Sequence, residues 1–157
     1  MNKLLLPKHP IDQISEAISL MAIILMLTFL SVHYSDIVTV LEKKQNTQTL
    51  PQIWLYTVLA LTTYGLLTYL ILHPPKKMQY PVKITPRNAS IQQELLLRLL
   101  RVLKATILIS TIGALVMLIR SAFDQESPAI INIIVGIQFF QIVAFIIYYI
   151  IAKKRES

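Results

Sequence analysis

The sequence predicts an all-α integral membrane protein in which four transmembrane helices form one domain over residues 1–157. The chain is 55% hydrophobic with a mean hydropathy of +0.61, which is more apolar surface than one soluble domain of this size can bury. Only 15% of its residues are charged, and most of them lie in short clusters between long uncharged stretches. Cysteine is absent, which excludes disulfides, thiolate metal sites and cysteine nucleophiles.

Four stretches have the length and composition of a membrane span. A helix needs about 20 residues to cross roughly 30 Å of hydrocarbon. The third stretch is short, so we expect Lys104 and Arg120 at its ends to extend their charged groups to the two interfaces. The expected spans cover residues 14–35, 52–73, 102–120 and 128–152.

The residues that flank these spans are typical of helix starts. Pro10, Pro51 and Pro128 precede or open the first, second and fourth helices, where a missing N–H group costs nothing. Asp12 and Glu16 lie near the positive end of the first helix, and we interpret them as favourable charges on its dipole.

The distribution of basic residues predicts the orientation. Of the 15 Lys and Arg residues, 12 lie in the two tails and between spans two and three. Only Lys43, Lys44 and Arg120 lie on the other side, where four acidic residues offset them. The positive-inside rule therefore places both termini in the cytoplasm. No small-x-small cleavage site follows the first span, so we interpret it as a retained helix.

Residues 74–101 are predicted to form a basic cytoplasmic connector. Four prolines between Pro74 and Pro86 favour an extended chain. A helix is then expected to begin between Thr85 and Ser90 and to continue without interruption into the third span. The polar residues of this amphipathic extension share an arc of about 80° on a helix; they are Arg87, Ser90, Glu94, Arg98 and Arg101.

This basic stripe suits anionic lipid headgroups, and docking of a cytosolic peptide or protein is the alternative. We expect no nucleic-acid partner, because the aromatic residues that a single-strand binder places among its cations are missing. The candidate partner or lipid contacts are Lys76, Lys77, Tyr80, Lys83, Arg87, Asn88, Arg98, Arg101 and Lys104.

A second set of candidates consists of polar side chains inside the spans. Facing lipid they would be costly, so we expect them to bond to other helices, with a groove for a ligand as the alternative. Gly65, Gly113 and Gly136 are interpreted as points of close helix approach. The candidate intramembrane polar contacts are Thr57, Tyr64, Thr68, Gln138 and Gln141.

The sequence offers no set of residues for catalysis, for a metal or for another cofactor. His33 ends the first span on the outer side of the membrane and His73 ends the second span on the inner side, so the two could not share a heme. His9 and His73 without a carboxylate cluster make a weak metal pair. We therefore expect no enzyme. A small transporter or channel component, a structural subunit of a membrane complex and a homo-oligomer stay open as alternatives.

The connector resembles the cytoplasmic signature of a bacterial membrane family that includes the SdpI-type immunity proteins. The matching residues are Tyr80-Pro81-Val82-Lys83-Ile84-Thr85, Asn88-Ala89, Gln92, Arg98-Leu99-Leu100-Arg101 and Leu103-Lys104. The resemblance covers about residues 14–120 and implies a multi-pass protein of the bacterial plasma membrane. It also implies a non-catalytic role by binding, either to a secreted peptide toxin through an outer loop between His33 and Pro51 or to a cytosolic regulator.

Overall fold

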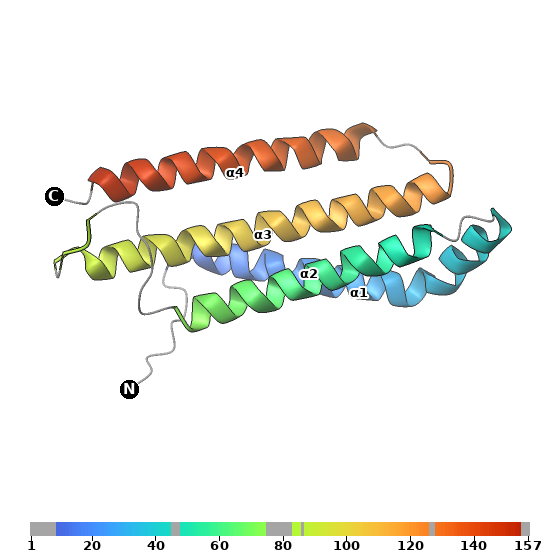
Figure 1. Cartoon of the computed structure of the whole chain (residues 1–157), viewed down its shortest axis with the longest axis horizontal. Helices are drawn as coiled ribbons and strands as arrows, with labels where there is room; N and C mark the ends of the chain where they lie inside the picture. Colours follow the sequence, from blue (N-terminus) through green and yellow to red (C-terminus); the bar gives the residue numbers. More distant parts are fainter. Residues whose placement is uncertain (1–8, 45–47, 75–82, 86, 126–127, 155–157) are drawn as a thin grey trace.

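The computed structural model has four helices: α1 (Pro10–Lys43), α2 (Thr49–Leu72), α3 (Ala89–Ala122) and α4 (Pro128–Lys154) (Figure 1). It describes residues 9–44, 48–74, 83–85, 87–125 and 128–154. Each helix is long and apolar enough to cross a membrane, which confirms the predicted all-helical membrane fold. The start of α1 and the end of α4 lie at the same end of the bundle (Figure 1).

The first helix is longer than the sequence predicted. Residues 36–43 were expected to belong to an outer loop, but α1 continues through them to Lys43. Ile37 and Leu41 of this extension are buried, at 2% and 3% exposure, in the common core. Packing of these apolar side chains against the rest of the bundle explains why the helix does not stop at Asp36.

The predicted start of the third helix is confirmed. α3 begins at Ala89 and continues for 34 residues through the amphipathic extension and the third span. α1 begins at Pro10, and the Nδ1 atom of His9 accepts a hydrogen bond from the backbone N–H of Ile11 at 3.3 Å. His9 thus serves as the N-cap of α1.

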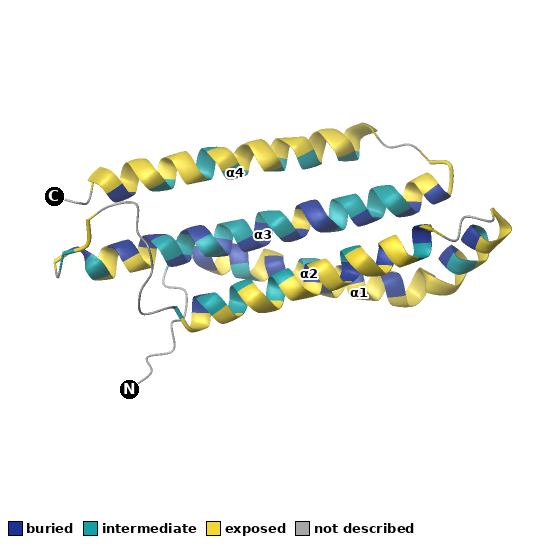
Figure 2. Cartoon of the chain, viewed as in Figure 1, coloured by how far each residue is buried: buried dark blue, intermediate teal, exposed yellow. Residues whose placement is uncertain are grey.

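The third helix is the centre of the bundle. It packs against α1, α2 and α4, whereas α4 contacts only α3 within the described residues. Most of α4 is exposed, while α3 is buried or half-buried along most of its length (Figure 2). The arrangement is therefore a three-helix unit with α4 laid along the side of α3.

The apolar core lies where α1, α2 and α3 meet. It extends from the middle of the bundle to the end opposite the termini, so the interior there is filled by aliphatic side chains. Its buried members are Ile23, Met26, Leu30, Ile37, Leu41, Ile53, Ala60, Leu108, Leu115, Ile119 and Ala122.

Only one of the three glycines lies at a tight helix contact. A Cβ atom added at Gly113 would lie 3.1 Å from Cγ1 of Ile134 on α4, whereas at Gly65 and Gly136 it would meet nothing within 4 Å. The predicted role in close helix approach thus fits Gly113 and is wrong for Gly65 and Gly136 within the described chain. α4 itself faces α3 with side chains three or four residues apart, namely Ile130, Ile134, Gln138 and Gln141, as expected for a helix-packing seam.

Replacing Gly113 by leucine should weaken the contact between α3 and α4. The added side chain would enter the space of Ile134, and overpacking of this kind costs about 1–3 kcal/mol. Unfolding in mixed detergent micelles measures the loss. Gly136→Leu is the matched control and should change stability by less than about 0.5 kcal/mol. Equal effects of the two substitutions would contradict the assignment of Gly113 to the contact.

Candidate functional site

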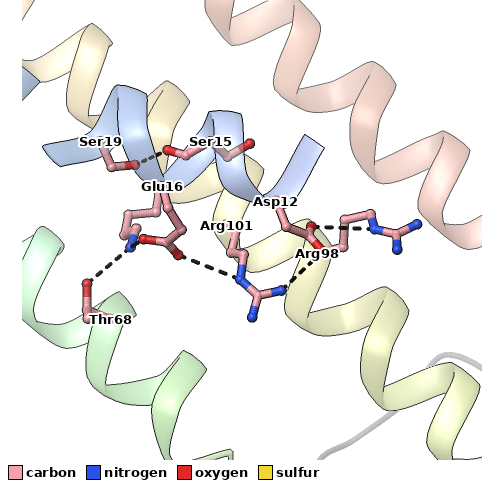
Figure 3. A network of polar contacts seen from close by, with 8 residues as sticks. Asp12, Ser15, Glu16, Ser19, Thr68, Arg98 and Arg101 are labelled. Carbon is pink, nitrogen blue, oxygen red and sulfur yellow. Dashed lines mark hydrogen bonds and ion pairs between the residues drawn. The ribbon is translucent and has the colours of Figure 1, made fainter. Parts of the chain in front are cut away.

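Five charged residues form an ion-pair network between α1 and α3, at the end of the bundle that carries the termini (Figure 3). Asp12 and Glu16 are four residues apart, which places both carboxylates on one face of α1. Arg98, Arg101 and Lys104 are each three residues apart and so lie along one side of α3. The acidic row of α1 faces the basic row of α3 (Figure 3).

Arg101 joins the two carboxylates of α1. Its Nη1 atom lies 3.4 Å from Oδ2 of Asp12, and its Nε atom lies 3.6 Å from Oε1 of Glu16. Arg98 supplies a second cation to Asp12, with Nε 3.5 Å from Oδ1. Arg98 also pairs with Glu94, four residues earlier on the same helix, Nη2 to Oε1 at 3.4 Å. The side chains of Asp12 and Arg101 are only 3% and 6% exposed.

Lys104 is the most buried member of the network, with no exposed side-chain surface. Its ammonium group donates to Oε2 of Glu16 and, at 3.1 Å, to Oγ1 of Thr68 on α2. It also lies 5.0 Å from the centre of the Tyr64 ring, a distance at which a cation is attracted to the ring face. Lys104 therefore links α1, α2 and α3 at one point.

The prediction that Lys104 extends its charge to the membrane interface is wrong. The interpretation of Lys104 and Arg101 as lipid or partner contacts is also wrong in this conformation, because both side chains are buried against the carboxylates of α1. Burying a charge in an ion pair with good geometry costs less free energy than exposing that charge to hydrocarbon. Arg98 keeps 27% of its side-chain surface exposed while pairing with Asp12 and Glu94.

Sequence reasoning missed the acidic half of this network. Asp12 and Glu16 were interpreted only as favourable charges on the helix dipole, although the i,i+4 spacing already placed them on one face. The sequence did contain a matching basic row, because Arg98, Arg101 and Lys104 lie three residues apart on another predicted helix.

Two further residues of the connector signature also make contacts within the chain. The Asn88 side chain accepts from the backbone N–H of Thr85 at 2.8 Å and donates to the Lys83 carbonyl at 3.2 Å, which ties residues 83–85 to the start of α3. Gln92 is fully buried and donates to the carbonyl of Ala152 at 2.9 Å. This bond joins the start of α3 to the last turns of α4.

The remaining connector candidates lie in different surroundings. Lys83 and Arg87 are exposed. Lys76, Lys77 and Tyr80 fall outside the described residues. The structure thus leaves the lipid or partner role of these five residues as a prediction.

The polar residues inside the spans form two groups. Tyr64 and Thr68 contact Lys104 of the network. Gln138 donates to the Ser110 hydroxyl at 3.3 Å and Gln141 donates to the Thr106 hydroxyl at 3.0 Å, so both amides bond from α4 to α3. The hydroxyl of Thr57 donates to the carbonyl of Ile53 on its own helix, and within the described part of the chain it makes no interhelical bond.

Within the described residues, no group of three or more His, Cys, Asp and Glu side chains is arranged to hold a metal. His33 lies beside Asp36, with Nδ1 3.9 Å from Oδ2, near the opposite end of α1 from the network. His73 stacks on Tyr69 with ring centres 4.9 Å apart. The three histidines lie at separate places along the helices.

No family model matches this chain, and no curated protein and no solved structure matches it either. The resemblance of the connector to the SdpI-type family stays a prediction.

Replacing Glu16 by glutamine should destabilise the bundle strongly, because it removes the carboxylate nearest to fully buried Lys104. Loss of one partner from a buried ion pair costs about 3–5 kcal/mol. Adding Lys104→Met in the same chain should restore most of the loss, because it removes the unbalanced charge. Unfolding of the single and double variants in mixed micelles gives the coupling energy.

Lys44→Gln is the control for this cycle. It breaks the ion pair between Lys44 and Asp124, whose side chains are 35% and 83% exposed, and should cost less than about 1 kcal/mol. A Glu16→Gln variant as stable as the original chain, or one that Lys104→Met fails to rescue, would show that this pairing does not hold α1 to α3.

Proposed function

We propose that this chain is a non-catalytic, multi-pass membrane protein that acts by binding a peptide or protein partner at the end of the bundle that carries both termini. The single observation that carries the proposal is that the segments joining the helices differ in length between the two ends of the bundle. At the opposite end α1 and α2 are joined across Lys44–Gln48, and α3 and α4 across residues 123–127. At the proposed binding end, residues 73–88 separate α2 from α3.

The ion-pair network supports the proposal because it makes this end a rigid base for the connector. Lys104 joins three helices, and Asn88 ties the last described residues of the connector to α3. A segment that is held at its ends loses less conformational entropy when a partner binds it. Residues 83–85 are therefore better prepared for binding than residues of a free loop.

The charge distribution supports a cytoplasmic location for this end. Twelve of the 15 basic residues belong to the tails or to the segment that contains the connector and the start of α3. The positive-inside rule favours the cytoplasm for such segments. The partner would accordingly be a cytosolic peptide or protein, and the resemblance to the SdpI-type family implies a protein of the bacterial plasma membrane.

The resemblance allows two versions of this function, and the fold favours one of them. In the first version, an outer loop recognises a secreted peptide. Here α1 stays helical to Lys43, and Ile37 and Leu41 are buried in the core, which leaves little loop for recognition. In the second version, a cytosolic regulator is held at the membrane, and the long connector on the rigid base suits that role better.

The geometry counts against transport. Between the network and the opposite end of the bundle, the buried side chains of the described residues are uncharged, with Ile23, Met26, Leu108 and Leu115 in the middle of the core. Gln138 and Gln141 bond to hydroxyls of α3 and do not line a passage among the described residues. Transporters normally keep an ionisable group near the middle of the membrane.

A photoreactive amino acid at Ile84 should crosslink the partner in intact cells. Ile84 belongs to the connector and is 39% exposed, so a bound partner would lie within reach of it. The same amino acid at exposed Gln125, at the opposite end of the bundle, is the control. A discrete protein adduct at position 84 and none at 125 is the expected result. Adducts only at 125, or none at either position, would contradict the proposed binding end.

Deletion of the gene tests the immunity version separately. If the protein protects against a secreted peptide, the deletion strain should become sensitive to at least one such peptide of the host or of neighbouring strains. The gene supplied in trans should restore resistance. Unchanged sensitivity to every peptide would exclude an immunity role and leave the binding of a cytosolic partner to be decided by the crosslink.

A further inference from the structure

We infer that Lys153 and Lys154, at the end of α4, form a contact site for the phosphate groups of anionic lipids. The site is distinct from the connector that binds the proposed partner, and it does not depend on that partner's identity. It differs from the basic stripe predicted from the sequence, because the structure divides the basic residues of this end into two groups with different surroundings.

The first group is neutralised within the chain. Arg98, Arg101 and Lys104 face three carboxylates, those of Asp12, Glu16 and Glu94. Three positive charges meet three negative charges in this cluster. The basic stripe of α3 therefore has little net charge left with which to attract an anionic surface, although the sequence predicted that it would be the main lipid contact.

The second group keeps its charge. Lys153 and Lys154 are exposed, and within the described part of the chain neither is in an ion pair. They occupy the last turn of α4, where the partial negative charge of the helix dipole favours cations. Arg87 is a third exposed cation at the same end of the bundle.

The position of α4 exposes this pair to lipid. α4 contacts only α3 among the described residues, and its remaining surface is apolar, with Phe145, Ile146 and Ile150 each more than half exposed. The 27 residues of α4 extend over about 40 Å, longer than the roughly 30 Å hydrocarbon layer, so its ends reach the headgroups. Lipids that surround α4 therefore place their phosphates beside Lys153 and Lys154.

Gln92 fixes the position of Lys153 and Lys154 along the axis of the bundle. Its hydrogen bond to the Ala152 carbonyl holds the residue next to Lys153 against α3, and both Gln92 and Ala152 are completely buried. The two lysines thus begin directly beyond the last packed turn of α4. Two cations held at one depth attract anionic lipid more strongly than two on a mobile tail, because less side-chain freedom is lost on binding.

Quenching of a tryptophan by brominated lipids in reconstituted vesicles tests this inference. Trp54 is the single tryptophan, so Trp54→Phe provides a silent background. Ile150→Trp then reports the lipid beside Lys153 and Lys154, and Ile131→Trp reports the lipid at the other end of the same helix; these residues are 58% and 47% exposed. Brominated phosphatidylglycerol is compared with brominated phosphatidylcholine at each position. Vesicles with the same lipids in both leaflets make the orientation of the protein irrelevant.

We expect phosphatidylglycerol to be enriched about fivefold or more at position 150, since each basic residue near the surface contributes about 1 kcal/mol. No comparable enrichment is expected at position 131. Lys153→Gln with Lys154→Gln should abolish the enrichment, whereas Glu94→Gln, which alters only the neutralised cluster, should not reduce it. Equal enrichment at both positions, or enrichment that survives the double substitution, would overturn the inference.

Two further arms identify the ligand. Inorganic phosphate added at constant ionic strength should not compete with the lipid, and full competition would show a discrete anion site in place of a lipid contact. If the double variant keeps its lipid preference but loses the protein crosslink at position 84, the lysines serve the partner and the lipid assignment is wrong. Loss of the lipid preference with an intact crosslink supports the lipid site and leaves the proposed function standing.

Discussion

The pairing of Lys104 with Glu16 is the contact on which the arrangement of the first three helices depends. An ammonium group without exposed surface in a membrane bundle needs a carboxylate beside it, because an unbalanced charge there costs several kcal/mol. Thr68 and Tyr64 of α2 complete the surroundings of the same ammonium group. Any arrangement of the helices that separated α1 from α3 would have to expose or neutralise this charge.

The first part of α3 contacts both α1 and α4. Arg98, Arg101 and Lys104 hold α1, whereas Gln92 bonds to the end of α4 and Asn88 closes the start of the helix. Farther along, Ser110 and Thr106 accept from the two glutamines of α4. Polar bonds thus set the order of the helices around α3, while apolar contacts fill the volume between them.

The basic residues of this protein differ in whether their charge is already paired within the chain. Net charge counts every lysine and arginine equally, but a cation paired with a buried carboxylate attracts neither lipid nor partner. Exposed residues such as Lys153 and Lys154 keep their attraction for anions, whereas Gln92 at the start of α3 is packed against Ala152, the residue before them. Lipid contact and partner binding can therefore use different parts of one basic end.

The sequence by itself determined the four spans, the uninterrupted helix from the connector into the third span and the glutamines on α4 as polar groups in need of partners. These features depend on local composition and on helical periodicity, which one chain segment contains in full. Only the tertiary structure decided that α1 extends to Lys43, that Gly113 alone lies at a close contact and that Glu16 meets Lys104 across 88 positions of sequence. The partner of a charged side chain depends on which helices become neighbours, and packing sets that choice, not the spacing within one helix.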